Sequence, residues 1–233
     1  KNTSASGNFS EGDIGTTFYQ SDKIYVLGAE NGDTDEYDRH VIIHEWGHYF
    51  EDNLSRTDSI GGEHGNGDKL DFRVAFGEGW GNAIAAIITD DSLYKDSSGI
   101  SQQDGFFIDI ENNQIPNGGW YNEASIQSVI YDLYDSDGDG VDNISLGLAP
   151  LYSVLVSESY RTMPSFTSVY SFIDELKVQR PAQFSEIDDL VRNQNIFGFG
   201  PFGEYETNDG GIPSVLPIYK MAEVNDMARF LAR

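Results

Sequence analysis

Two histidines and a glutamate near residue 44 have the types and the spacing that metal-assisted hydrolysis requires. The segment His44-Glu45-Trp46-Gly47-His48 fits the pattern H-E-x-x-H. On a helix, residues four apart share one face with Cβ atoms about 5–6 Å apart, so both imidazoles can bind one metal ion. Glu45 lies beside the pair and can accept a proton from water without taking a ligand position. This arrangement is typical of zinc-dependent hydrolases.

The residues around this motif favour a buried helix. The alternative is a surface helix with two unrelated histidines, which would carry a polar outer stripe. The neighbouring side chains are instead strongly apolar. They are Val41, Ile42, Ile43, Trp46, Tyr49 and Phe50. Burying two histidines and a glutamate is costly unless they are paired or bind a metal, so these neighbours favour a metal site.

A catalytic zinc usually takes three protein ligands, and two candidates for the third lie downstream. Glu78 lies between glycines in Phe76-Gly77-Glu78-Gly79-Trp80, where a metal or another backbone can approach closely. Asn82, one turn later, can hydrogen-bond the far nitrogen of a histidine ligand. His64, in a glycine-rich loop, can reach the metal or stabilise an oxyanion. We expect Glu78 to be the ligand and His64 to contact the transition state or substrate. The alternatives are an exposed glutamate and a loop histidine without a role.

Two other side chains are weaker candidates for the same site. Tyr121 follows Gly118-Gly119-Trp120, and its phenol hydroxyl can donate to an oxyanion. The chain has 13 tyrosines, so a position in the core is the alternative. His40 is one turn before His44 and can touch the site, but the acidic turn nearby favours a partly exposed histidine near a helix start.

An acidic run after residue 134 matches the first half of an EF-hand calcium loop. Gly140 supplies the sharp turn, and Leu146 stands where a bidentate glutamate is expected. Calcium would therefore lock a loop, and a solvated acidic turn is the alternative. The candidate calcium ligands are Asp135, Asp137, Asp139 and Asp142.

The spacing of His44, His48 and Glu78 resembles that of the gluzincin (thermolysin-like) zinc metallopeptidases, over roughly residues 24–88. Gly-Gly-x-His followed by Ala-Phe-Gly-Glu-Gly-Trp is also similar to a group of bacterial exported metallopeptidases. The resemblance implies a zincin fold, one zinc bound by these three residues, and Glu45 as general base. Asn82 stands where the best-known members have Asp, and the ligand helix lacks their Asn-Glu opening. Their downstream oxyanion histidine has no clear match here, so substrate preference does not transfer.

The elements that must position these residues are a small sheet and several helices. Apolar spacing and turn residues predict strands, helices and loops along the chain. Strands are expected at 16–19 and 23–27, loops at 53–71, 89–119 and 197–217, and helices around the motif and at 72–88, 123–134, 147–160, 165–178, 184–194 and 218–232.

Composition excludes several classes of protein. A net charge of −25 in 233 residues repels nucleic acid and anionic lipid. The absence of cysteine excludes a disulfide scaffold and a cysteine-ligated metal. No stretch approaches the ~20 apolar residues of a membrane span. We expect a secreted, periplasmic or cell-surface protein that acts on peptides or proteins.

Together these patterns predict an α+β protein with a zincin-like core. Residues 1–120 would hold the small sheet and the metal site, and a mostly helical part at 121–233 would complete the cleft, or the two would form one continuous domain. The predicted function is a zinc peptidase with Glu45 as general base. The alternatives are a non-catalytic adhesion protein that retains the metal, a metal-dependent hydrolase of non-peptide substrates, and a calcium-binding structural module. The intact Glu45 argues against the first alternative.

Overall fold

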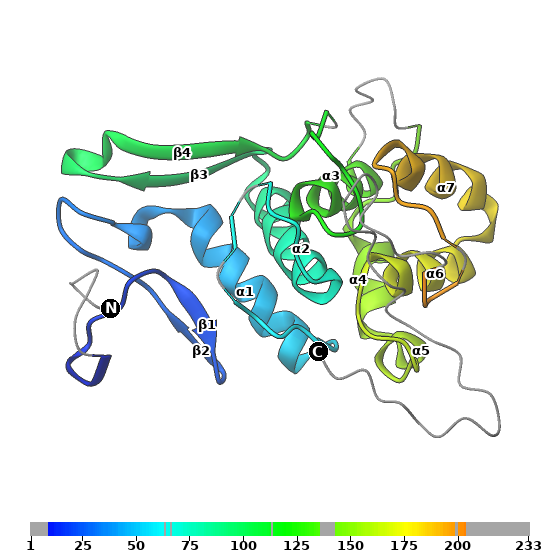
Figure 1. Cartoon of the computed structure of the whole chain (residues 1–233), viewed down its shortest axis with the longest axis horizontal. Coiled ribbons are helices and arrows are strands. Elements are labelled where there is room, and N and C mark those ends of the chain that lie inside the picture. The colour runs from blue at the N-terminus through cyan, green and yellow to red at the C-terminus, as the bar shows by residue number, and fades with distance from the viewer. Residues whose placement is uncertain are drawn as a thin grey trace.

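A computed structural model describes residues 9–62, 64–65, 67–112, 114–135, 143–198 and 200–203. The described part contains seven α-helices and two antiparallel two-stranded sheets, which confirms the α+β class. Both hairpins lie at one end of the molecule and helices α4 to α7 at the other (Figure 1). Helices α1, α2 and α3 lie between them, so the predicted motif helix is central.

The first hairpin pairs β1 (Phe18–Gln20) with β2 (Lys23–Tyr25) and agrees with the two predicted strands. The second pairs β3 (Leu93–Ser98) with β4 (Asp104–Asp109). The prediction of an irregular segment at 89–119 is therefore wrong over these strands. Most of their side chains are exposed or half-buried, so they lack the apolar alternation by which a strand is recognised in a sequence.

Helix α2 (Phe72–Thr89) is almost wholly buried between α1 (Arg39–Asn53) and α3 (Glu123–Tyr134). Glycines allow the close approach on both sides. A Cβ atom at Gly81 would lie 2.8 Å from the His44 ring on α1, and one at Gly79 would lie 2.5 Å from Ile126 on α3. Such short contacts essentially do not occur in real structures, so a side chain at either position would force the neighbouring residue to move.

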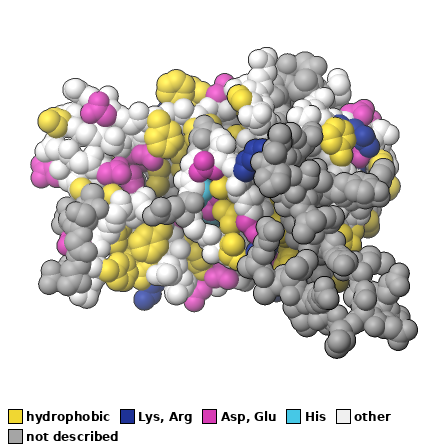
Figure 2. Space-filling model, viewed as in Figure 1, with side chains coloured by type: hydrophobic (Ala, Val, Ile, Leu, Met, Phe, Trp, Pro, Cys, Tyr) yellow, Lys and Arg dark blue, Asp and Glu magenta, His cyan; other side chains and the backbone are white. Residues whose placement is uncertain are grey.

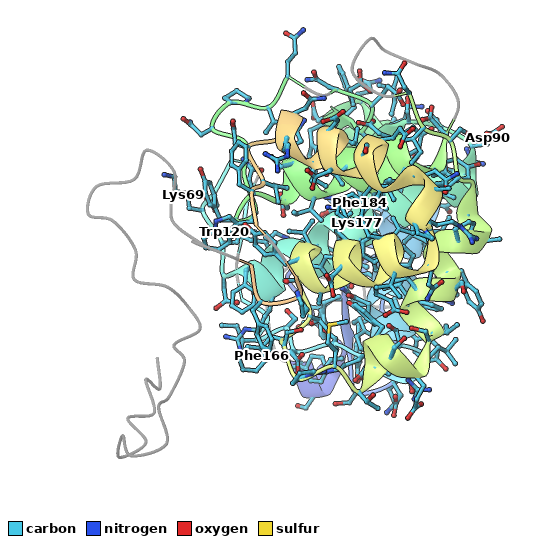
Figure 3. The ribbon with its side chains drawn as sticks, turned by 90° about the vertical axis from the view of Figure 1, so that its right-hand side faces the viewer. Lys69, Asp90, Trp120, Phe166, Lys177 and Phe184 are labelled. Atoms are coloured by element: carbon cyan, nitrogen blue, oxygen red, sulfur yellow. The ribbon has the colours of Figure 1, made fainter. Side chains whose placement is uncertain are left out.

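The helical part consists of α4 (Leu148–Val156), α5 (Glu158–Arg161), α6 (Val169–Gln179) and α7 (Phe184–Asn193). The predicted helix at 147–160 is divided at Ser157, whose hydroxyl accepts from the Tyr160 amide and so begins a new helix. Figure 3 shows α6 and α7 side by side, with Lys177 and Phe184 where they meet. The Lys177 ammonium lies 2.5 Å from Asp188 and 4.6 Å from the Phe184 ring centroid.

One hydrophobic core runs from Val41 to Ile196 and includes residues on both sides of the predicted boundary at 120. Polar contacts also join the end of α1 to the helical part. Arg56 donates to the Met163 carbonyl, and Asp58 and Thr167 exchange two hydrogen bonds. The division into two domains stays a prediction. The predicted closing helix at 218–232 lies outside the described residues.

Candidate metal centre

Helix α1 presents its two motif histidines toward Glu78 on α2. His44 is 8% exposed, and its Nε2 lies 3.1 Å from His48 Nε2. Glu78 Oε2 lies 3.1 Å from the first of these nitrogens and 3.3 Å from the second. The structure thus brings together three side chains that the sequence separates by up to 34 positions.

These separations fit a zinc ion. Zinc takes nitrogen and oxygen ligands at about 2.0–2.2 Å, so the edges of its ligand tetrahedron are about 3.3–3.6 Å long. The three distances above are within a few tenths of an ångström of that range. Two imidazoles and a carboxylate are also a donor set that zinc prefers. The residues present therefore suit this metal, with little movement required.

Both histidines are oriented by a second partner on their other ring nitrogen. Asn82 Oδ1 lies 2.8 Å from His44 Nδ1, and the Asn82 amide donates to Gln127 on α3 at 2.8 Å. His48 Nδ1 lies 3.5 Å from the buried carboxylate of Glu51. With Nδ1 carrying the proton, each Nε2 has its lone pair available for a metal.

Sequence reasoning found Asn82 but missed Glu51 and Gln127. The signal for Glu51 was its place three residues after His48, which puts it on the same helix face. For Gln127 it was a polar residue inside the apolar pattern of α3. The partner of Gln127 becomes its neighbour only when α2 and α3 pack, whereas the contact of Glu51 with His48 lies within α1.

The general-base candidate Glu45 lies beside the candidate metal ligands and is held by the first hairpin. The Tyr19 amide of β1 donates to Glu45 Oε2 at 2.7 Å. Burial raises the pKa of this carboxyl, while His44 and His48 act in the opposite direction. The backbone bond occupies one carboxylate oxygen and leaves the other for a proton transfer.

The loop histidine His64 also reaches the centre. Its Nε2 lies 3.2 Å from Glu78 Oε2 and 3.7 Å from Glu123 Oε2. The hydrogen bond to Glu78 raises the pKa of His64 to about 9. This contact with Glu78 places His64 where it could bind the metal or donate a hydrogen bond to the substrate. Both roles therefore stay predictions.

The carboxylates around the two motif histidines stabilise positive charge on neighbouring groups. Burial opposes ionisation of Glu78, but hydrogen bonds from His44, His48 and His64 hold the pKa of its carboxyl well below the usual range. Burial likewise disfavours the His48 cation, yet hydrogen bonds to Glu51 and Glu78 raise its pKa well above the usual value. An environment that stabilises protonated imidazoles in this way also stabilises a bound metal dication.

The centre forms one side of a cavity of about 840 Å³, within the range of ligand-binding clefts. Both hairpins contribute walls; on the second, the cross-strand pairs Tyr94–Ile108 and Asp96–Phe106 face inward. Figure 2 shows a small area of histidine (cyan) near the middle of the view, with acidic side chains (magenta) around it. Among the described lining residues there is no lysine or arginine. The acidic ones are Asp35, Glu45, Glu51, Asp52, Glu78, Asp96 and Glu123.

A match to a known protein family shows what this chain is related to. A family model described as the mycolysin C-terminal domain matches residues 4–184. The chain belongs to the mycolysin C-terminal domain family. This is a domain of bacterial zinc metallopeptidases, so the chain is related to metallopeptidases. Comparisons with curated proteins and with solved structures give no significant match.

The matched region, residues 4–184, contains every residue of the candidate metal centre. Mycolysin-related metallopeptidases use zinc, and mycolysin-type proteases are extracellular bacterial enzymes. The match supports peptide or protein substrates at the level of the family. Among the described residues, no helix is long and apolar enough to cross a membrane.

The remaining predicted positions lie away from this centre or outside the described residues. Tyr121 is 1% exposed, does not line the cavity, and packs its ring on Trp120 and beneath Lys69. Its buried ring corresponds to the core alternative. His40 is also buried, with Nε2 3.1 Å from the Asp91 carbonyl oxygen. Of the candidate calcium ligands, Asp135 is described, and Asp137, Asp139 and Asp142 lie outside the described residues.

Proposed function

We propose that this chain is a zinc-dependent peptidase in which Glu45 is the general base. One observation carries the proposal: three zinc-compatible donor atoms lie 3.1–3.3 Å apart beside Glu45 in one substrate-sized cavity. His44, His48 and Glu78 would hold the metal. The family relationship to zinc metallopeptidases supports this reading.

The chemistry divides between the metal and the side chains. When bound, zinc supplies a Lewis acid that polarises a peptide carbonyl and increases the acidity of water. Glu45 takes the proton of the attacking water and delivers it to the leaving amine. The Tyr19 amide keeps this carboxylate in place during both transfers. His64 is placed to donate a hydrogen bond to the oxyanion.

The substrate would lie extended along the cavity. Residues 16–19 of the first hairpin line it on one side, and the inward face of the second hairpin lines it on the other. A strand beside the metal can hold a peptide by main-chain hydrogen bonds, while alternate side chains enter pockets. We also propose that the protein acts outside the cell, as mycolysin-type proteases do.

The test compares the wild type with Glu45→Gln on a mixed peptide library, with and without a zinc chelator. The exposed Glu186→Gln on α7 makes the same chemical change away from the cavity and serves as control. We expect cleavage by the wild type and the control, and its loss on chelation. Glu45→Gln should bind zinc as the wild type does and lose at least about 100-fold in turnover, the usual contribution of a general base.

Other outcomes select the alternatives. Zinc retention with no peptide cleavage by the wild type would support a non-catalytic binding protein. Hydrolysis confined to esters or other non-peptide bonds would support a metal-dependent hydrolase of non-peptide substrates. Full activity in Glu45→Gln would exclude its role as base, and full zinc retention in Glu78→Ala would point to His64 as the third ligand.

A further inference from the structure

Three carboxyl groups outside the zinc centre meet where the turn before α1 lies against β3. Asp33 and Asp35 come from the turn, and Asp96 comes from the strand. Each contributes an oxygen, and these oxygens all lie within 4.8 Å of one another. Among the described residues, no lysine or arginine forms an ion pair with any of the three. Their mutual repulsion is therefore not offset by a basic side chain.

The buried carboxylate of Asp35 has one oxygen without a hydrogen-bond donor. It is 2% exposed, and its Oδ2 accepts a hydrogen bond from the Thr17 hydroxyl. Its Oδ1 is buried and has no donor, and the same is true of Asp33 Oδ1. An unpaired buried carboxylate oxygen is costly, so it is expected either to bind a cation or to be neutralised by a proton.

The surrounding backbone holds the three acids in place. Asp38 accepts hydrogen bonds from the amide and hydroxyl of Ser97 at 2.9 Å, next to Asp96 in the strand. Asp33 forms a bridge with Ser98, and the Gly99 amide donates to the Gly32 carbonyl at 2.5 Å. The second hairpin and the segment leading into α1 are accordingly adjacent in Figure 1. The cluster is thus built by fixed tertiary contacts.

We propose that Asp33, Asp35 and Asp96 bind a calcium ion. The donors are all oxygen, which suits a hard cation and disfavours zinc. Calcium–oxygen distances of 2.3–2.6 Å allow ligand oxygens up to about 5 Å apart, and the observed span falls within this limit. Magnesium keeps several waters and is usually bound by one or two carboxylates, so a site of three carboxylates suits it less well.

Electrostatics supports the presence of a cation. Burial, with repulsion from neighbouring aspartates, raises the pKa of both Asp35 and Asp96 to about 6. Near neutral pH these groups are largely ionised and repel one another, and a divalent ion removes that repulsion. The bound ion would join the turn that leads into the motif helix to a wall of the cavity. Its effect would be on stability and on the shape of the cleft.

The test measures calcium binding and thermal unfolding in the Glu45→Gln background, at pH 7.5 with constant zinc, so that self-digestion cannot interfere. Asp35→Asn and Asp96→Asn each remove one ligand charge. Asp109→Asn, exposed at the opposite end of the same hairpin, is the matched control. Asp137→Asn tests whether calcium binds instead to the acidic run at 135–142.

Calcium at about 100 times its dissociation constant should raise the melting temperature of the parent and of Asp109→Asn by roughly 5–10 °C. Asp35→Asn and Asp96→Asn should lose most of this shift and at least tenfold in calcium affinity. If Asp35→Asn does not fold, the half-buried Asp96→Asn decides alone. Absence of a shift in the parent, or its retention in Asp96→Asn with loss in Asp137→Asn, would overturn the proposal.

Discussion

Asn82 links the candidate metal centre to α3, because its side-chain oxygen accepts a hydrogen bond from His44 Nδ1 and its amide donates to Gln127. Removing such a partner frees the imidazole to rotate and to take the other tautomer. We expect Asn82→Ala to weaken zinc binding by roughly 10- to 100-fold, while Asn82→Asp retains it. Competition with a chromogenic chelator measures the affinity.

Gln127→Ala serves as comparison for that variant, because it removes only the support of Asn82 and should cost less. Equal zinc affinity in Asn82→Ala and the wild type would show that the packing of α1 alone orients the ring.

At this scale the sequence predicted the spacing within each helix and that Glu78, Asn82 and His64 would lie near the two histidines, but not their other partners. The side-by-side placement of His44 and His48 follows from their spacing on a helix, and the Glu78–Asn82 spacing follows in the same way. The bond from the Tyr19 amide to Glu45 could not be predicted, because a backbone donor has no residue-type signature. The contact of His64 with Glu123 depends on how a glycine-rich loop folds back, which local sequence does not determine.

Substitution of two glycines of α2, Gly79 and Gly81, should have different effects on stability and zinc affinity. Gly79→Ala places a methyl group against Ile126 on α3, and we expect a loss of about 1–3 kcal/mol in stability. Gly81→Ala places one against the His44 ring, so it should lower zinc affinity as well as stability. Urea unfolding and zinc titration of both variants separate the two effects.

Each glycine variant is the control for the other, since both make the same change two residues apart on one helix. Of the two, Gly81 alone faces the candidate ligand His44, so equal loss of zinc affinity would contradict this assignment of their roles.

Among the described elements, the helices were predicted apart from the break at Ser157, and the second hairpin was missed. Helices α2 and α3 show their apolar residues plainly because they pack on several neighbours. Strands β3 and β4 are held by each other's backbone and by the turn before α1, and exposed aromatics such as Phe107 follow no buried pattern. Pairing between polar strands depends on main-chain bonds that residue types do not reveal.

At the scale of the whole molecule, charge should determine which peptides enter the cavity. The cavity lining is acidic, and the chain carries a net charge of −25. We expect peptides with lysine or arginine near the cut bond to have a kcat/KM roughly tenfold above that of glutamate counterparts at low salt. The advantage should shrink between 20 mM and 500 mM sodium chloride, since salt screens such fields.

An uncharged peptide of the same length is the reference, and its kcat/KM should change little with salt. A preference for acidic peptides, or a salt effect equal for all three, would show that the lining does not select by charge.

The different neighbours of Gly79 and Gly81 also have a consequence for how this sequence can change over evolutionary time. A side chain gained at position 79 would meet the Cβ atom of Ile126 at 2.5 Å, which every residue except glycine carries, so it requires glycine at position 126 or a shift of α3. His44 cannot become smaller without losing its imidazole, so no such second substitution can compensate a side chain at position 81. Natural relatives that bind the same metal should therefore keep glycine at 81, and those with a side chain at 79 should have glycine at 126 or a displaced α3.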